Sequence, residues 1–231
     1  MKPMIVLTVL STLVLCMQAT FSKAARDRPD DQPMAYRSLY EAPRFQEPLR
    51  FAELDYPRLH QAMFYATNAV RVRRGLAPLV HHPRLEKAAK RYAERMVEHN
   101  FMAHVDPYAD EHLRTPEQRL RAVGVVNAMP AENLASYFGI QYQEGEQVYR
   151  LPGGKGQFSR TRDGQPIPNH TYRSFAEGVV DAWMSSPEHR ANILAERALQ
   201  LGCGAAFFWD ASGFPKFLLV QLYQLDERVR T

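Results

Sequence analysis

Cysteine is scarce in this chain of 231 residues, which contains only Cys16 and Cys203. A small secreted scaffold that depends on several disulfides is therefore excluded, because two cysteines allow one bridge at most. If residues 1–25 are removed during export, Cys203 stands alone and the mature chain forms no internal disulfide. Cys203 lies between two glycines in an apolar run, so we expect a small buried residue.

Long hydrophobic runs are also missing, apart from Met4–Met17. This run is too short to cross a bilayer, follows a lysine and precedes small residues, which is typical of a secretory signal peptide. We predict a signal peptide over residues 1–25, no transmembrane segment after its cleavage, and a secreted or periplasmic location. Lipoprotein anchoring at Cys16 is not favoured, because the bulky Leu15 stands where a small residue is expected.

The sequence has no dense run of lysine or arginine and no nucleic-acid-binding motif, so we expect no nucleic-acid partner. Its 29 Lys and Arg against 25 Asp and Glu give a net charge of +4, which indicates a solvated surface with a slight preference for anionic partners. The hydrophobic content of 45% is that of an ordinary globular domain.

Composition divides the rest of the chain into a leader and one domain. Residues 26–55 combine several prolines with scattered charges and aromatics, which indicates an extended leader over the domain surface. A helical pattern starts near Tyr56, so we place the domain at residues 56–231. The turn signals PGGKG and RDGQPIP indicate a hairpin-forming insert at residues 136–173. Its aromatic side chains either cover a ligand or, as we favour, form a small core of their own.

Several helices and one long hairpin are predicted in the domain. Apolar residues at helical spacing, preceded by prolines or capping patterns, predict helices that begin at Pro57, Pro83, Pro116 and Pro187, and one opened by a capping box at Ser174 and Glu177. The runs 198–209 and 214–225, joined by a turn, predict a β-hairpin. A short buried strand or turn is expected at 125–134. The fold class is therefore α+β, with helices flanking a mostly antiparallel sheet.

The segment Asp181–Leu194, DAWMSSPEHRANIL, ends one helix and starts another. Ser186 and Pro187 are typical of an N-cap followed by a proline in the first turn. His189 would then lie in that first turn, where the positive end of the helix dipole disfavours a second proton on the imidazole. A neutral histidine there suits metal coordination or hydrogen bonding.

Further motifs accompany this segment in a fixed order. They are FMAHVD at 101–106, AENLA at 131–135, and GCGAAFF with FPKFLLVQLYQL near the carboxyl end, while Asn68 and Arg71 form an Asn-x-x-Arg pair in the first helix. Together, over roughly Pro57 to Leu225, these motifs resemble the CAP superfamily, also called the SCP domain, which includes cysteine-rich secretory proteins and plant pathogenesis-related proteins. The low cysteine content resembles the bacterial branch. The resemblance implies a three-layer α–β–α sandwich.

The resemblance also implies a central cleft lined by two histidines and acidic residues. The matching cleft positions in this sequence are His104, Glu132, Ser186 and His189, of which Ser186 stands where many members carry a second acid. Asp106 or Glu188 could take the place of that acid, and the sequence gives no basis for choosing between them.

Two imidazoles and one carboxylate would suit zinc, so His104, His189 and Glu132 are candidate metal ligands. The favoured function is binding of an extracellular ligand, which could be a metal, a lipid, a peptide or a cell-envelope component. A metal-dependent hydrolase or peptidase is the alternative, although no serine carries a nucleophile motif and no catalytic residue is assigned. A structural envelope protein, with the three side chains bonded to one another, also stays open. The remaining histidines are expected to be solvated, namely His60, His81, His82, His99, His112 and His170.

Overall fold

The computed structural model describes residues 41–125 and 129–225, so the predicted signal peptide and the first part of the leader lie outside the described residues. Its α-helices are α3 (Tyr56–Arg73), α4 (Pro83–Glu98), α5 (Pro116–Ala122), α6 (Tyr172–Ser185) and α7 (Pro187–Ile193). Short 3-10 helices are η1 (Pro43–Gln46) and η2 (Glu111–Leu113). The strands are β1 (Val80–His81), β2 (Met129–Phe138), β3 (Tyr149–Arg150), β4 (Phe158–Ser159), β5 (Ala198–Trp209) and β6 (Pro215–Leu225).

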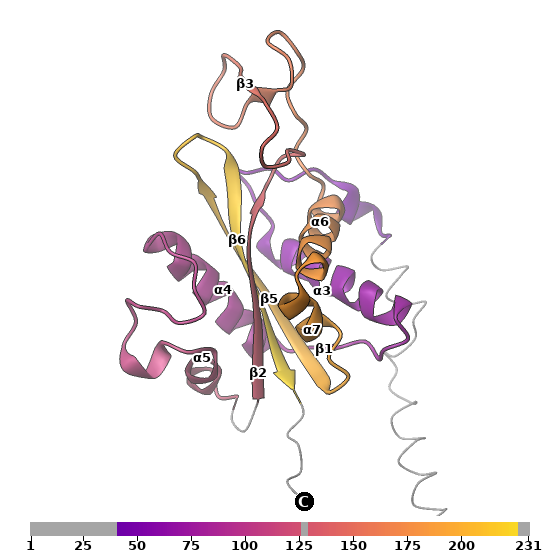
Figure 1. Ribbon diagram of the computed structural model, residues 1–231, viewed down its shortest axis with the longest axis vertical. Coiled ribbons are helices and arrows are strands. Elements are labelled where there is room, and N and C mark those ends of the chain that lie inside the picture. Colours follow the sequence, from indigo (N-terminus) through magenta and orange to yellow (C-terminus); the bar gives the residue numbers. More distant parts are fainter. Residues whose placement is uncertain (1–40, 126–128, 226–231) are drawn as a thin grey trace, which may run out of the picture.

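Helices cover both faces of a four-stranded sheet with the order β1-β5-β6-β2, in which only β1 and β5 run parallel. In Figure 1, α4 and α5 lie on one side of this sheet and α3, α6 and α7 on the other. This arrangement confirms the predicted α+β class and the α–β–α layers. Side chains alternate between the faces, so that Leu219 belongs to the α3 and α6 core and Val220 to the α4 core.

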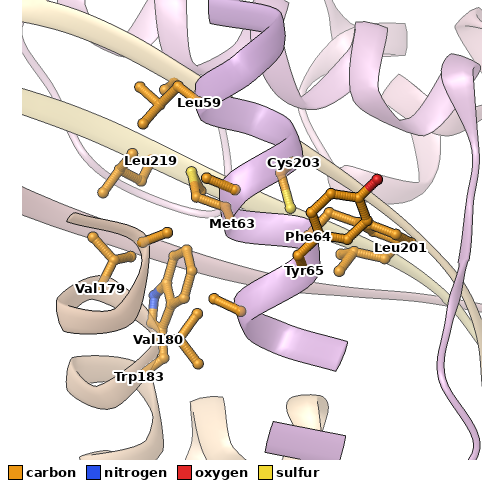
Figure 2. Close-up of a cluster of buried hydrophobic side chains, with 14 of the residues drawn as sticks. Leu59, Met63, Phe64, Tyr65, Val179, Val180, Trp183, Leu201, Cys203 and Leu219 are labelled. Carbon is orange, nitrogen blue, oxygen red and sulfur yellow. The ribbon is translucent and has the colours of Figure 1, made fainter. Parts of the chain in front are cut away.

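The larger core lies between the sheet and the pair α3 and α6. Figure 2 shows Met63 of α3, Trp183 of α6 and Leu219 of β6 gathered in this cluster, and all three are buried. Cys203 is also fully buried there, as expected. Burying side chains of this size removes apolar surface from water, which stabilises the fold by about 1.5–3 kcal/mol for each fully buried Leu, Met or Phe.

The Asn-x-x-Arg pair of α3 has a structural role. Asn68 donates to the Leu79 carbonyl and accepts from the Leu79 amide, which fixes the chain just before β1. The buried Arg71 donates from Nη1 to the carbonyls of Ile193 and Ala195, 2.7 and 2.9 Å away. These carbonyls lie at the end of α7, where backbone groups lack helical partners. Arg71 therefore holds α7 against the large core.

Side chains from neighbouring helices bond the outer backbone groups of the sheet. At the β5 edge, the Ala205 amide donates to His60 Nε2 and the Phe207 amide donates to the Tyr56 hydroxyl. At the β2 edge, Trp183 Nε1 donates to the Leu134 carbonyl, 3.0 Å away. The prediction that His60 is solvated was wrong: its burial satisfies an amide that would otherwise lack a partner.

Two other histidines also differ from the solvated prediction. His82 is the N-cap of α4, where its Nδ1 accepts from the Arg84 and Leu85 amides. His170 is half-buried, and this burial lowers its pKa to about 4. Both histidines leave solvent for a local reason. His82 bonds backbone amides at the start of α4, and His170 packs against the Tyr137 and Phe175 rings.

Several predicted boundaries also shift. The α6 capping box is formed by Thr171 and Ser174, not by Ser174 and Glu177, because the serine hydroxyl accepts from the Thr171 amide. Strand β2 continues to Phe138, so the insert begins later than predicted.

The described part of the leader contains a 3-10 helix and a bridge between Pro48 and Thr171, and it buries two apolar side chains, Phe45 and Leu49.

The insert forms the small β3–β4 hairpin with a hydrophobic cluster of its own. Phe158 stacks on Phe214 of the β5–β6 connection, with ring centroids 3.8 Å apart. Tyr142 and Phe138 pack around this pair. The hairpin projects beyond the end of the sheet at which β2 finishes (Figure 1). Phe158 and Tyr142 of the insert therefore belong to a small core, which was the favoured interpretation, whereas Tyr172 packs in the larger core and Tyr149 lies in neither cluster.

Candidate functional site

Glu132 lies at the centre of the candidate site. Its position in β2 is opposite Leu222, whose side chain belongs to the α4 core, so the carboxylate lies on the α4 face of the sheet. One oxygen, Oε1, is 2.9 Å from His104 Nδ1, and the other, Oε2, is 2.6 Å from Arg119 Nη2. A carboxylate only accepts, so Nδ1 of His104 carries the proton in this bond.

Burial differs sharply along this chain of contacts. The side chain of Glu132 is 2% exposed and that of Arg119 is 8% exposed, whereas the His104 side chain is 55% exposed. Arg119 also donates to the carbonyls of His104 and Arg114, and its guanidinium lies 3.4 Å from the centroid of the Tyr92 ring. The buried ion pair of Glu132 and Arg119 therefore holds the exposed imidazole of His104 in place.

Arg119 was not predicted as a site residue. It lies in α5, one turn after the N-cap Thr115, whose capping box with Gln118 is present as predicted. Local sequence places this arginine on a short helix but does not show that it reaches β2. The sequence offered only one weak signal, an arginine beside the apolar Leu120 in a predicted helix. The structure shows that both residues are buried.

His189 approaches the same region from the opposite layer. It occupies the third position of α7, and its carbonyl accepts from Asn133 Nδ2 of β2, 3.2 Å away. Asn192, one turn later, donates to the Glu132 carbonyl and to Asn133 Oδ1. These bonds fasten α7 to the outer edge of β2 beside Glu132. The sequence could have indicated Asn192, because positions three apart share a helix face.

Ser186 is the N-cap of α7, as predicted, but its side chain makes no capping hydrogen bond. Neither proposed replacement acid joins the contacts of Glu132. Asp106 is buried and bonds Arg95 Nε at 2.6 Å and the Tyr108 amide at 2.9 Å. Glu188 is exposed at the start of α7. The structure thus brings His104 and Glu132 into contact, with His189 nearby and Asp106 in a separate ion pair.

The two histidines of the site have opposite shifts in pKa. The hydrogen bond with Glu132 raises the pKa of His104, and the charge of Glu132 adds to this effect. Burial lowers the pKa of His189, and the charge of His104 lowers it further. His189 was expected to be neutral because of the helix dipole, and the direction agrees, although burial and His104 are the causes.

The candidate ligands do not form a three-ligand metal site as arranged. Both oxygens of Glu132 are occupied, and the Arg119 guanidinium places a positive charge beside them. Within residues 41–125 and 129–225, no three His, Cys, Asp or Glu side chains are grouped so that they could hold a metal ion. Zinc binding stays a prediction, and it would have to use His104 Nε2 and His189.

Comparison with known proteins gives one family match. The model of the cysteine-rich secretory protein family, CAP, matches residues 64–223, which is more than half of the chain. No curated protein sequence matches this chain. In the part of the chain that the structure describes, we find no helix long and apolar enough to cross a membrane.

Three bacterial proteins of known structure are similar to this chain. An extracellular protein of Bacillus anthracis that contains an SCP domain matches with a TM-score of 0.51 and 21% identity. The match covers 78% of this chain and 45% of that protein. An outer surface protein of Borrelia burgdorferi has a TM-score of 0.45 and 19% identity, covering 71% and 90%. A cysteine-rich secretory protein of Staphylococcus aureus has a TM-score of 0.44 and 14% identity, covering 74% and 40%. This chain thus spans less than half of two of these proteins.

Proposed function

This chain belongs to the cysteine-rich secretory protein family, CAP, and from this premise we propose that it is a secreted or periplasmic bacterial protein that binds an extracellular ligand through His104 and His189. Glu132 supports the first of these histidines. The favoured ligands are polar, such as a peptide or a fragment of the cell envelope.

The observation that carries the proposal is the exposed imidazole held by a buried ion pair. Burying Glu132 and Arg119 costs desolvation energy, and such a pair is weak evidence for stability. Its geometric effect is specific, because it fixes the ring of His104 through Nδ1 and leaves Nε2 for a partner. An orientation held this firmly suits recognition of a ligand.

The opposite directions of the two pKa shifts favour a ligand with both acceptor and donor groups. A raised pKa makes His104 the better proton donor at neutral pH, and a lowered pKa makes His189 the better acceptor. A ligand that offers an acidic oxygen to one ring and an N–H or O–H group to the other would satisfy both. Peptides and cell-wall polymers carry such groups close together, whereas the acyl chains of a lipid do not.

A hydrolase or peptidase is the second candidate, and the same pKa shifts favour it. Two groups whose pKa values are moved apart can act as general acid and general base, here His104 and His189. A screen of peptide and ester substrates tests this candidate. Turnover that disappears in both His104→Ala and His189→Ala would support it.

Binding is tested by titration calorimetry with three probes: soluble peptidoglycan fragments, phosphatidylglycerol vesicles and zinc ions alone. The variants are the His104→Ala, His189→Ala double change and, as a control, His112→Ala, whose side chain is exposed in η2. We expect saturable binding of peptidoglycan fragments, weakened about tenfold or more in the double variant because hydrogen bonds to charged groups contribute about 1.5–3 kcal/mol.

The control variant should bind like the parent. Binding of vesicles or zinc in place of peptidoglycan, with the same loss in the double variant, would keep the site and change the ligand. If no probe binds, or if the folded double variant binds as tightly as the parent, the proposal is overturned and a structural role for the three side chains is favoured.

A further inference from the structure

A cavity lies at the opposite edge of the sheet from the candidate site. Glu132 is on the edge strand β2, whereas this cavity lies beside the edge strand β1, between α3 and α4. Its volume is about 400 Å³, within the range of about 300–1,000 Å³ typical of small-molecule sites. The lining residues that matter here are Arg44, Asp55, Pro57, Arg58, Phe64, His81 and Glu86.

The acids that line this cavity are already paired. Arg58 contacts Glu47 at 2.5 Å and Asp55 at 3.1 Å. Glu86 accepts from His60 at 3.3 Å and contacts His81 Nε2 at 2.6 Å. Although burial acts to raise it, these hydrogen bonds lower the pKa of Glu86 to about 2. The cavity therefore has no acidic group in need of a cationic ligand.

Arg44, by contrast, has no acidic partner among the residues that the structure describes. Its Nη2 donates to the neutral Gln61 Oε1 at 2.8 Å, and its guanidinium lies 4.8 Å from the Phe45 ring centroid. The remaining N–H groups of this exposed cation can bind an anion. A guanidinium offers several donors in a planar fork that matches a carboxylate.

His81 supplies a second oriented group. Its Nε2 bonds Glu86, and its ring packs edge-on against Phe64 with centroids 5.7 Å apart, so the ring is held from two sides. Nδ1 remains for a ligand, and 44% of the side chain is exposed.

We propose that this cavity binds a small organic carboxylate. Arg44 holds the carboxylate, and His81 adds a hydrogen bond from Nδ1 in its doubly protonated form, in which Nε2 donates to Glu86 and Nδ1 to the ligand. Pro57 and Phe64 contact the apolar body of the ligand. Arg44 supplies the positive charge for an anion, because it is the lining cation without an acidic partner in the described chain, and the aromatic wall favours a ligand with a flat apolar part. The site is independent of His104 and His189.

The experiment compares three probes with the same ring and different charge: benzoate, benzamide and benzylamine. Binding to the mature full chain is followed by NMR, using the His81 ring signals and titration of chemical shifts. The variants are Arg44→Gln and His81→Gln. The matched control is Arg73→Gln, because Arg73 is exposed at the end of α3 and does not line the cavity.

We expect benzoate to shift the His81 signals saturably, with benzamide and benzylamine at least about tenfold weaker. Arg44→Gln and His81→Gln should each weaken benzoate binding about fivefold or more, and Arg73→Gln should leave it unchanged. Equal binding of benzoate and benzamide, equal effects of Arg73→Gln and Arg44→Gln, or no saturable shift would overturn the proposal. The His104→Ala, His189→Ala variant should keep benzoate binding, which separates this proposal from the proposed function.

Discussion

At the residue scale, Glu132 affects both the pKa of His104, through their hydrogen bond, and the stability of the site, through its ion pair with Arg119. Glu132→Gln keeps the shape of the side chain and removes its charge, leaving a buried guanidinium without its counter-charge. We expect the free energy of unfolding to fall by about 3 kcal/mol, at the low end for breaking a buried ion pair. Urea unfolding of parent and variant measures this change.

Glu117→Gln is the matched control, because Glu117 pairs with Arg121 at the same distance of 2.6 Å on the exposed face of α5. An exposed pair one helical turn apart contributes about 0.3–0.5 kcal/mol, so this variant should be close to the parent. Equal losses in the two variants would show that the burial of Glu132 does not matter.

Glu132→Gln should also alter how the free energy of unfolding depends on pH. The contact with Glu132 raises the pKa of His104, so the protonated ring stabilises the fold. This contribution is present below the unfolded pKa of about 6.5 and is lost as the pH rises through the higher folded pKa. In Glu132→Gln the pKa of His104 should fall towards its ordinary value, which NMR titration measures.

The difference in stability between parent and Glu132→Gln should therefore be larger at about pH 5 than at about pH 9. The effect should be small, since solvent screens a ring that is more than half exposed. If the stability difference between parent and variant grew with pH, the predicted direction of the pH dependence would be wrong. If the pKa of His104 were the same in Glu132→Gln, the contact with Glu132 would not be what raises it.

At the scale of elements, two glycines of β5 set the distance between the sheet and α4. A Cβ on Gly202 would lie 2.1 Å from the Glu86 backbone nitrogen, and one on Gly204 would lie 2.2 Å from the Ala89 carbonyl carbon. Gly204→Ala should destabilise the fold by about 3 kcal/mol, at the upper end for overpacking because backbone must move. Thermal and urea unfolding measure the loss.

Gly75→Ala serves as the comparison for this prediction. Gly75 has a φ of 76° and no atom within 4 Å of a built Cβ, so only backbone strain opposes alanine there. We expect a loss of about 1 kcal/mol. A smaller loss for Gly204→Ala than for Gly75→Ala would contradict the close packing of α4 on β5.

Elements with local signals could be predicted from the sequence. Prolines and caps fixed the starts of α3, α4, α5 and α7 to within a residue, and β5 was predicted with its observed bounds. The start of α6 was missed because its capping box uses Ser174, a residue less typical of that position than glutamate or glutamine.

Features that depend on tertiary contacts could not be predicted from spacing. His60 looked like a surface residue, but its buried ring accepts from the Ala205 amide of β5 and contacts Glu86 of α4. Arg119 reaches Glu132 because α5 packs on the α4 face of the sheet beside β2, which no local pattern encodes. The positions of His104, Glu132 and His189 came from resemblance to a family, and the bond between the first two supports their grouping.

At the scale of the whole molecule, the two ends of β2 separate the insert from the candidate site. Glu132 lies near the beginning of this strand and the insert follows its end at Phe138 (Figure 1). Six strand residues span about 20 Å, so the β3–β4 hairpin is not positioned to gate His104. The edges of the sheet separate the candidate site from the carboxylate cavity in the same way, with one at β2 and the other at β1.

Removing the insert tests this separation. The Gln141 amide donates to the Pro168 carbonyl at 2.9 Å, and Ile140 pairs with Asn169, so a short turn can replace residues 142–167. We expect a folded variant that is less stable by about 2 kcal/mol, because Phe214 loses the stacked ring of Phe158. NMR should show the same His104 pKa as in the parent, and calorimetry the same affinity for peptidoglycan fragments. A folded deletion variant with a changed His104 pKa or weaker binding would mean that the insert acts on the site across the length of β2.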